Sequence, residues 1–338
     1  MRKIEVNASK RYTVSIGEDI SAAFSFPFRE SCEKVLIVTD KNVAELYCDL
    51  IRRADMGKEV FTYVLSAGEN AKSAENYIAI LNFMADKGFQ RNDAVISFGG
   101  GVIGDLAAFC ASTYMRGVSL YAVPTTILAA VDSSVGGKTA INLDRGKNLC
   151  GTFYQPDAVN ICTDFFKTLP DRERACGLGE VIKYAFLSDT VTEKDITGGN
   201  AVDLVYNCVA IKKDIVERDE REQGDRKLLN LGHTVGHAIE RKSGFSLSHG
   251  ECVVKGIYAA LKISKKLCAL SDEEFYAAEK ILTCFGHDLT IPYSADEIIS
   301  EIKCDKKAVG NFVDFVLIGK DLKAVIERIS MEDIKAAL

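Results

Sequence analysis

The first half of the chain alternates short, apolar, β-branched runs with segments of helical periodicity. The runs that predict strands are VLIVTD (35–40), EVFTYVL (59–65), AVISFGG (94–100) and VSLYAVPTT (118–126). Apolar residues at helical spacing lie between them, near 41–56, 72–88 and 102–114. Because parallel neighbours need a crossover connection, this alternation predicts an α/β domain with a mostly parallel sheet. Ligands of such sheets bind outside the carboxyl ends of the strands.

The pattern changes near residue 165 to long stretches at helical spacing. They cover 172–187, 200–221, 228–242, 249–268, 273–284 and 295–304. Only VDFVLIG (313–319) resembles a strand, and the chain is expected to run from it directly into a last helix. We therefore expect an α/β domain over 1–165 and a mainly helical domain over 166–338. No flexible linker separates them, so they are expected to pack around a shared cleft.

Composition narrows the possible functions. The 338 residues are enough for two domains, and 47% hydrophobic with 27% charged residues is typical of a globular protein. The net charge of −6 argues against nucleic acid as a partner, so an anionic substrate would need a local cationic pocket. No apolar run is long enough to cross a bilayer and none resembles a signal peptide, which predicts a cytoplasmic protein. The eleven cysteines stand singly, without a CxxC pair, and are expected to be reduced core residues.

Three of the four histidines lie in one short stretch, NLGHTVGHAIERKSGFSLSHGE (230–251). His233 and His237 are four apart and would share one face of a helix, and His249 is expected at a helix start. Neutral imidazoles are common ligands of divalent metals, and a catalytic site needs three protein ligands and an open position. The sequence thus indicates a metal site completed by a carboxylate. The alternative is a pair of ordinary histidines on a half-buried helix.

A second polar feature lies in CGLGEVIKYAF (176–186). Glu180 and Lys183 are three apart on one face of an apolar helix, where an unneeded charge pair would be costly to bury. Glu180 is the natural carboxylate ligand, and Lys183 would then lie near the metal. A simple surface salt bridge is the alternative.

The glycines of GGGVIGD (99–105) lie where a strand is expected to turn into a helix, and they satisfy GxGxxG. Such a turn lets backbone N–H groups approach a pyrophosphate. The segments 39–42 and 68–72 each close an earlier strand and could contact a ribose or base. Three ordinary turns are the alternative reading.

The glycine-rich segment 124–151 contains VGGKT, which lacks the four-residue spacer of an ATP-binding loop. From the residues alone, Lys138 and Lys147 are interpreted as cations for a substrate anion. A solvated surface loop is the alternative.

Together these motifs resemble a known family. The ordered set is GGGVIGD, STYMRG, PTT, VDSSVGGKTAIN, GKN, GxGEVIKY, NxGHTxGHAxE, HGExVxxG and DKK. From about residue 35 to 319 it is similar to the 3-dehydroquinate synthase family of the sugar-phosphate cyclase superfamily. The resemblance implies a Rossmann-like N-terminal domain that binds NAD and a helical domain that binds zinc or cobalt, with the active site in the cleft between them.

The resemblance also implies roles for individual residues. The metal ligands would be Glu180, His233 and His249, so that His237 becomes a substrate residue. The NAD-binding residues would be Asp40, Asn42, Glu69, Lys72, Gly100, Gly101, Asp105, Thr125, Thr126 and Lys147. The substrate residues would be Asp132, Lys138, Asn148, Lys183, Lys212, Arg226, Asn230, His237 and Lys306, with Arg116 reaching in from a second subunit of a homodimer. The choice between Lys306 and Lys307 stays open.

The implied reaction is a step of the shikimate route to aromatic amino acids. A lyase of this family converts 3-deoxy-D-arabino-heptulosonate 7-phosphate to 3-dehydroquinate and phosphate. The steps are transient oxidation by NAD, elimination of phosphate, reduction, ring opening and intramolecular aldol closure. We expect Lys138, Asn148, Lys306 and Arg116 on the phosphate, and Lys212, Arg226 and His237 on the carboxylate.

Other functions are compatible with parts of this pattern. Sister cyclases act on sedoheptulose 7-phosphate or glucose 6-phosphate, which lack the carboxylate, and Arg226, Asn230 and His237 together favour the acid substrate. A metal-dependent polyol dehydrogenase would not need two anion pockets. A non-enzymatic NAD-binding or metal-sensing protein is the alternative from another class, and a closed four-ligand zinc site would support it.

Overall fold

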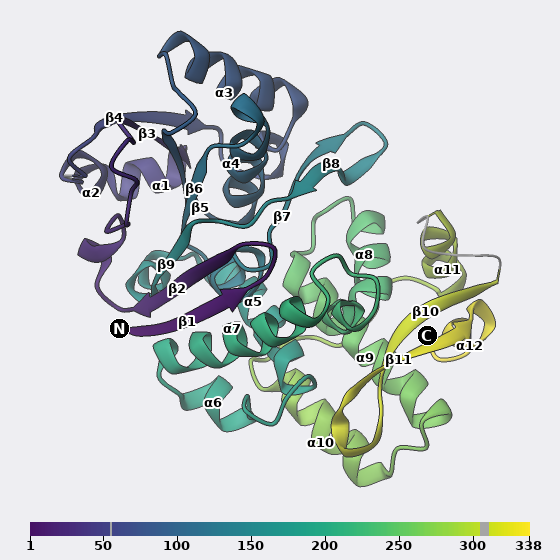
Figure 1. Ribbon diagram of the computed structural model, residues 1–338. Helices are drawn as coiled ribbons and strands as arrows, with labels where there is room; N and C mark the ends of the chain where they lie inside the picture. The colour runs from purple at the N-terminus through teal and green to yellow at the C-terminus, as the bar shows by residue number, and fades with distance from the viewer. Residues whose placement is uncertain (55, 305–310) are drawn as a thin grey trace. The chain divides into compact units, whose positions relative to one another are not determined.

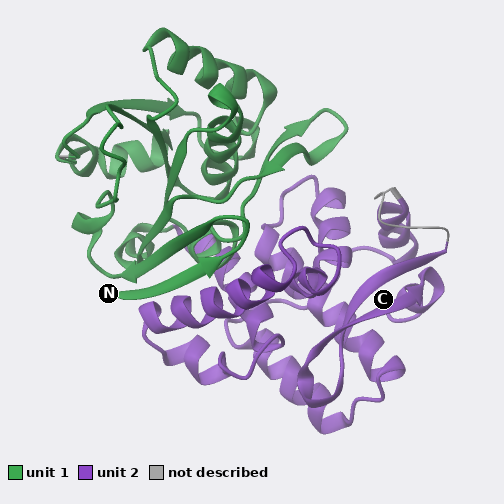
Figure 2. Ribbon diagram, viewed as in Figure 1, with its two compact units in different colours: residues 1–169 green, residues 170–338 purple. Residues whose placement is uncertain are grey.

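The computed structural model describes residues 1–54, 56–304 and 311–338 (Figure 1). The chain forms two compact units, Met1–Leu169 and Pro170–Leu338 (Figure 2). The boundary expected after residue 165 falls inside a 3-10 helix, Thr163–Thr168, which closes the first unit. The architecture confirms the predicted fold class, an α/β unit followed by a mainly helical unit.

The first unit contains a seven-stranded sheet in the order β1-β2-β9-β6-β5-β3-β4. The strands are β1 (Arg2–Asn7), β2 (Arg11–Gly17), β3 (Lys34–Asp40), β4 (Glu59–Leu65), β5 (Ala94–Gly99), β6 (Ser119–Pro124) and β9 (Ala158–Cys162). All four predicted strands are present, and they pair in parallel. Only the N-terminal pair, β1 and β2, is antiparallel.

The order of the strands places a ligand crevice. From β3 the chain goes first to β4, and then returns across β3 to β5 on its other side. The direction of winding therefore reverses between β3 and β5. Ligands of open α/β sheets bind at such a switch point, outside the carboxyl ends of the strands. Here those ends are Asp40 and Gly99.

Helices cover both faces of this sheet (Figure 1). They are α1 (Lys41–Leu46), α2 (Cys48–Arg52), α3 (Ala74–Asp86) and α4 (Gly101–Thr113). Helices α3 and α4 bury one face, where Ile80 and Leu106 pack with Leu36 in a single apolar cluster. The single helix expected over 41–56 was wrong: the chain breaks at Tyr47, which has φ −123° and ψ 27°. The ring of Tyr47 packs edge-on against Phe165, with centroids 4.9 Å apart, and this tertiary contact accompanies the break.

The glycine-rich segment after β6 contains structure that the sequence did not predict. A π-helical turn, Ala129–Ser133, is followed by the hairpin of β7 (Lys138–Leu143) and β8 (Gly146–Phe153). The two strands pair antiparallel, and their register shifts between Ile141 and Leu143. Helix α4 packs against β7, and Ile141 belongs to the same apolar cluster as Leu106.

The second unit consists mainly of helices. They are α5 (Asp171–Ala185), α6 (Glu193–Gly198), α7 (Ala201–Arg218), α8 (His233–Lys242), α9 (His249–Leu267), α10 (Asp272–Thr283), α11 (Ala295–Cys304) and α12 (Met331–Lys335). A 3-10 helix, Asp225–Asn230, precedes α8. The core is one apolar cluster that includes Val253 and Ile257 of α9 and Leu317 of strand β10 (Phe312–Ile318).

The C-terminal part corrects one prediction. Strand β10 (Phe312–Ile318) does not lead directly into the last helix, because β11 (Ala324–Ser330) lies between them and pairs with β10 antiparallel. The sequence AVIERIS of β11 shows only a weak apolar alternation, and most of the strand is half-buried or exposed. Its pairing with β10, rather than a local pattern, defines it as a strand.

Helices α8 and α9 pack closely because glycines line their contact. Gly232 has φ +80°, and a Cβ on it would lie 2.6 Å from the backbone oxygen of Val253. A Cβ on Gly236 would lie 2.8 Å from the backbone oxygen of Cys252. The continuous helix expected over 228–242 was therefore wrong, since Gly232 in the left-handed region separates the 3-10 helix from α8. Gly232 and Gly236 thus let the backbones of α8 and α9 approach closely.

We expect Gly232→Ala to lower the free energy of unfolding by more than Gly244→Ala. Both glycines have positive φ, +80° and +59°, so both substitutions cost about 1–2 kcal/mol of backbone strain. Only at Gly232 does the new Cβ meet backbone atoms, whereas nothing lies within 4 Å of a Cβ on Gly244. Urea unfolding of both variants would test this difference. Equal losses of stability would show that close approach to α9 contributes nothing.

Two expectations from composition can be compared with the structure. No helix among the described residues is long and apolar enough to cross a membrane. The cysteines whose side chains the structure describes carry free thiols. Six of them are buried, including Cys110 and Cys252, although Cys48 is exposed. Burial raises the pKa of Cys252 to about 12, which keeps this thiol protonated and unreactive.

Candidate active site

Three side chains of the second unit converge on one point. The Nε2 atom of His249 lies 3.0 Å from Oε1 of Glu180, and the Nε2 atom of His233 lies 3.3 Å from the same oxygen. Glu180 comes from α5, His233 begins α8 and His249 begins α9. Helix α9 contacts both α5 and α8, so helix packing brings together residues that are far apart in sequence.

The local structure explains why each histidine is oriented in this way. The Nδ1–H of His233 donates to the carbonyl of Leu231 at 3.1 Å, because a carbonyl can only accept. The Nδ1–H of His249 donates to the carboxylate of Glu240 at 3.1 Å. Ser248 caps α9 in a reciprocal capping box with Glu251, and this fixes the helix start at His249. In both rings Nε2 therefore faces Glu180, which is the arrangement of metal-ligating histidines supported by outer-shell acceptors.

The spacing of these atoms fits a divalent metal. Ligand atoms about 2.0–2.1 Å from a tetrahedral zinc ion lie roughly 3.3 Å from one another. The distances from Oε1 of Glu180 to Nε2 of His233 and of His249, 3.3 Å and 3.0 Å, are close to this value. The donor set of two imidazoles and one carboxylate is the set found in catalytic zinc sites, which keep a fourth position open. The residues present therefore fit the metal that the sequence predicted.

Electrostatics at this point favour an ionised carboxylate. Burial alone would raise the pKa of Glu180, but Lys183 and His233 outweigh it and hold this pKa well below its usual range. Burial lowers the pKa of His249, but hydrogen bonds to Glu180 and Glu240 outweigh it and raise this pKa to about 10. A metal ion that displaces the imidazole proton of His249 would replace that proton's favourable interactions with the carboxylates of Glu180 and Glu240.

Lys183 is part of this centre. Its Nζ lies 2.6 Å from Oε2 of Glu180, and both side chains are 1% exposed. The alternative of a surface salt bridge is thus wrong. A buried ion pair of this kind costs desolvation energy and contributes little net stability, so stability alone does not account for it.

His237 lies beside the three ligands that the resemblance implied. Its ring centroid is 5.2 Å from that of His233 and 5.7 Å from that of His249. The ligand-capable nitrogens of all three histidines lie within 4.8 Å of one another. Two overlapping sets of three ligands are therefore possible on geometry, one with Glu180 and one with His237.

Two other cations expected to bind substrate are also buried in this unit. Arg226 is 2% exposed and Lys212 is 5% exposed. Nη1 of Arg226 donates to the carbonyl of Glu220, and Asp219 accepts the backbone N–H of Arg226 at 3.1 Å. Helix α7, which carries Lys212, contacts both α5 and the 3-10 helix that carries Arg226. The Nδ2 group of Asn230 donates to Glu222 at 2.5 Å.

The residues expected to bind NAD lie in the first unit, at the carboxyl ends of its parallel strands. They are Asp40 at the end of β3 and Asn42 after it, Glu69 and Lys72 after β4, Gly100, Gly101 and Asp105 after β5, and Thr125 and Thr126 after β6, while Lys147 lies on β8. Asp40 caps α1 by accepting the backbone N–H groups of Asn42 and Val43. Gly100 caps α4 without a side chain, and a Cβ there would lie 3.1 Å from Thr126. The bare start of α4 is suited to a pyrophosphate.

The β7–β8 hairpin approaches the same edge of the sheet. Nζ of Lys72, which is 4% exposed, contacts both Oδ2 of Asp105 and Oδ1 of Asn148. Asn148 was expected on the substrate phosphate, and the structure places it in contact with residues of the predicted nucleotide site. Lys147 is half-buried beside it.

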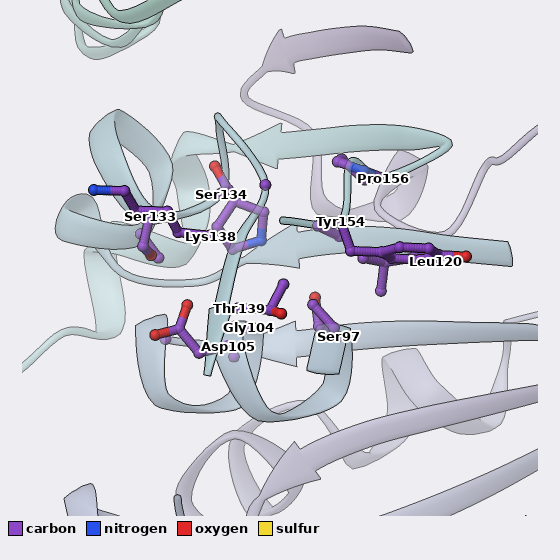
Figure 3. Close-up of a pocket in the computed structure, with 17 residues that line it drawn as sticks. Ser97, Gly104, Asp105, Leu120, Ser133, Ser134, Lys138, Thr139, Tyr154 and Pro156 are labelled. Atoms are coloured by element: carbon purple, nitrogen blue, oxygen red, sulfur yellow. The ribbon is translucent and has the colours of Figure 1, made fainter. Parts of the chain in front are cut away.

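A pocket lies under the start of the hairpin (Figure 3). Its walls include Gly100 and Asp105 from the nucleotide turn, Ser133 from the π-helical turn next to Asp132, and Lys138 from the start of β7. The exposed cation Lys138 thus lies beside the glycine turn. Ala108, Leu120 and Pro124 contribute apolar atoms to the lining. The pocket has the mixed lining usual for small-molecule sites.

Arg116 and Lys306 are the remaining residues expected to bind substrate. Arg116 is exposed on the first unit, and its contribution to a second subunit stays a prediction. Lys306 and Lys307 lie outside the described residues.

The sequence did not indicate Glu240, Glu222 or Asn142 as functional. Glu240 could have been found, because the motif NxGHTxGHAxE places it seven residues after His233, two helical turns along the same helix.

Comparison with solved structures identifies the class of fold. The chain is similar to 2-deoxy-scyllo-inosose synthase complexed with carbaglucose-6-phosphate, NAD+ and Co2+, with TM-score 0.88, 22% identity and 99% of each chain covered. It is also similar to 2-epi-5-epi-valiolone synthase from Streptomyces hygroscopicus with NAD+ and Zn2+ bound, with TM-score 0.86, 22% identity and coverage of 100% and 98%. An iron-containing alcohol dehydrogenase from Thermotoga maritima gives TM-score 0.64, at 14% identity and 96% coverage of each chain. The fold is that of the sugar-phosphate cyclases.

Sequence comparison identifies the family within this class. Models of the N-terminal and C-terminal parts of 3-dehydroquinate synthase match residues 62–176 and 177–308. The 3-dehydroquinate synthase of Alkaliphilus metalliredigens is 38% identical, covering 94% of this chain and 92% of its own length. That of Halalkalibacterium halodurans is 40% identical, covering 98% and 95%. The chain belongs to the 3-dehydroquinate synthase family.

Proposed function

We propose that this protein is a 3-dehydroquinate synthase, a phosphate-eliminating lyase that converts 3-deoxy-D-arabino-heptulosonate 7-phosphate to 3-dehydroquinate and phosphate. The observation that carries this proposal is the convergence of His233 and His249 on Glu180, in a chain 38–40% identical to named 3-dehydroquinate synthases over nearly its full length. The reaction belongs to aromatic amino-acid biosynthesis, by way of the shikimate pathway. The first unit binds NAD in this proposal, and the second binds metal and substrate.

Zinc or cobalt is held by Glu180, His233 and His249. When bound, such an ion acts as a Lewis acid that lowers the pKa of a substrate hydroxyl. The protein's part is to fix the ligands: Glu240 and the carbonyl of Leu231 hold the two rings with Nε2 facing Glu180. Lys183 keeps Glu180 ionised and adds a proton donor beside it.

NAD is held at the carboxyl ends of β3 to β6. Its chemistry is the reversible acceptance of hydride, so that it is regenerated in each cycle. The glycine turn at Gly100 and Gly101 admits the pyrophosphate, and Lys72, paired with Asp105, supplies a buried cation at the same edge. Lys147 lies close by on the hairpin.

Cations bind the two anionic ends of the substrate. Arg226 and Lys212 hold the carboxylate, where the planar guanidinium can form two parallel hydrogen bonds. Asn230 and His237 contact the same end. Lys138 and Asn148 hold the phosphate with Asp132 nearby, and Arg116 of a second subunit and Lys306 complete that pocket. Burying Lys183, Lys212 and Arg226 at no more than 5% exposure is costly, and a doubly anionic substrate offsets this cost.

A sister cyclase is the second candidate, because the solved structures that the fold matches include 2-deoxy-scyllo-inosose synthase. Its substrate class carries a phosphate but no carboxylate. Arg226, Asn230 and His237 together favour the acid substrate, because a carboxylate calls for a cation and hydrogen-bond donors.

Turnover should require metal but should not consume NAD. We expect stoichiometric release of phosphate and formation of 3-dehydroquinate from the seven-carbon acid phosphate, with no accumulation of NADH. Removal of the metal with a chelator should abolish turnover, and Zn2+ or Co2+ should restore it. Phosphate release and absorbance at the NADH band are the measurements. Activity on sedoheptulose 7-phosphate, with none on the acid phosphate, would contradict the proposal and identify a sister cyclase.

A further inference from the structure

Asn142 is the centre of a link between the β7–β8 hairpin and the segment after β4. Its Nδ2 group donates to Oε1 of Glu69 at 2.6 Å, and its backbone N–H donates to the carbonyl of Lys72 at 2.9 Å. Its Oδ1 accepts the backbone N–H of Asn148 at 3.0 Å. One residue therefore hydrogen-bonds to three others that are proposed to bind NAD or substrate.

The hairpin has an irregular register at this position. Ile141 pairs with Cys150, and Leu143 pairs with Gly146, so Asn142 alone stands opposite residues 147–149. Asn148, in the middle of these three, has φ +57°. A bulge of this kind re-aims side chains and leaves ladder groups without their usual partners. The side chain of Asn142 replaces the missing ladder partner by accepting the N–H of Asn148.

The residues re-aimed by the bulge meet the nucleotide residues. Oδ1 of Asn148 accepts from the buried ammonium of Lys72, which is also paired with Asp105. Lys147 lies beside Asn148 on the bulge. The contacts thus form a closed loop, in which Asn142 holds Glu69 and Asn148 while Lys72 holds Asn148 and Asp105.

We propose that Asn142 is a positioning residue for nucleotide binding, which fixes Glu69 and the bulge at Lys147 and Asn148 in the geometry that receives NAD. The inference rests on the NAD binding of the proposed function. Asn142 acts through its neighbours and does not itself touch the cofactor. An amide is needed, because Glu69 requires a donor and the N–H of Asn148 requires an acceptor.

A purely structural role makes a different prediction. Four pairs of the ladder, from Lys138 with Phe153 to Ile141 with Cys150, precede the bulge and do not involve Asn142. Asn142 is only half-buried, so its removal leaves no large cavity. Replacement of Asn142 should therefore leave the fold and the metal site of the second unit intact while it changes the nucleotide site.

The test uses Asn142→Ala in the full-length, metal-loaded protein. The Kd and KM for NAD should rise on the order of tenfold, the effect of one hydrogen bond to a charged group, with metal content and Tm retained. Hydrogen exchange of residues 146–150 should become faster. Asp144→Ala is the matched control, because Asp144 is an exposed residue of the same hairpin, and its NAD affinity should equal that of the wild type. Calorimetry measures the Kd without turnover.

A double-mutant cycle tests the pair directly. Asn142→Asp keeps an acceptor for Asn148 but places a second carboxylate against Glu69, so NAD affinity should fall. Glu69→Gln supplies the missing donor, and Asn142→Asp should therefore cost much less in the Glu69→Gln background than alone. This comparison holds whatever Glu69 contributes to NAD directly, and it remains available if Asn142→Ala fails to fold.

The outcomes separate this inference from the proposed function. NAD affinities within twofold of the wild type in Asn142→Ala, or equal costs of Asn142→Asp in both backgrounds, would overturn the positioning role even in an active enzyme. A wild-type protein that binds NAD but does not form 3-dehydroquinate would overturn the proposed function, and a weaker Kd in Asn142→Ala would then still support the inference.

Discussion

Glu180→Gln should lose most of its bound metal and nearly all of its dehydroquinate synthase activity. The substitution keeps the shape of the side chain but replaces a charged ligand with a neutral amide, at the point where Nε2 of His233 and Nε2 of His249 converge. The loss should exceed the roughly 10–100-fold that removal of an outer-shell partner costs. Metal content after dialysis and the rate of phosphate release are the measurements.

Two control variants sharpen this experiment. Glu240→Gln removes only the acceptor of the Nδ1–H of His249, and should weaken metal affinity by about 10–100-fold while allowing a loaded, active enzyme. Glu180→Gln/Lys183→Met removes the buried ammonium that Glu180 faces, so this double variant should recover stability without recovering metal.

The same experiment decides between the two overlapping ligand sets. His237→Gln should retain metal and lose activity if His237 contacts substrate. If Glu180→Gln kept one metal ion per chain while His237→Gln lost it, the ligands would be the three histidines, whose nitrogens lie within 4.8 Å of one another. The assignment of Glu180 would then be wrong.

Arg226→Ala should lower kcat/KM for the acid phosphate by roughly 10²-fold or more, the effect of truncating one partner of a buried charged contact. The guanidinium is 2% exposed, and the substrate carboxylate would lose its bidentate partner. The amount of bound metal and the Kd for NAD should not change, because Arg226 is assigned to the substrate carboxylate and not to the metal site or the NAD site. Steady-state kinetics, metal analysis and calorimetry together measure these three quantities.

Arg218→Ala is the matched control for this substitution. Arg218 ends α7, its side chain is 59% exposed, and it pairs with Asp225 at 3.5 Å. Its removal takes away the same charge from the same region but should leave kcat/KM nearly unchanged, since exposed ion pairs contribute little. Loss of metal in Arg226→Ala would refute the carboxylate role and assign Arg226 to the metal centre.

Local patterns predicted much of the fold. The strands β3, β4, β5 and β6 are short β-branched runs bounded by polar residues and glycine, so their local sequence and their tertiary role agree. Helices α5 and α9 were predicted because their apolar residues recur at helical spacing. The errors fall where a tertiary contact overrides the local pattern. Tyr47 interrupts a helix where it packs on Phe165, and β11 is a strand because it pairs with β10.

The candidate site shows the same division. Residue types indicated a metal site at the histidine cluster with Glu180 nearby, and the resemblance to the family implied that Glu180, His233 and His249 are the ligands. The sequence could not show that Nδ1 of His249 bonds Glu240, or that Asn142 bridges Glu69 and Asn148. These contacts join residues whose separation in space is not encoded in any local pattern.

The sequence by itself determined the family and the two-part α/β and helical organisation, and it predicted which residues bind metal, nucleotide and anions. Periodicity and composition are local properties, so they can be recognised in the sequence alone. Only the tertiary structure decided which nitrogen of each imidazole faces Glu180, that Lys183 and Arg226 are buried, and that the β7–β8 hairpin reaches Lys72. Burial, tautomer and hydrogen-bond partner depend on helix packing and strand register, which are set by contacts between distant parts of the chain.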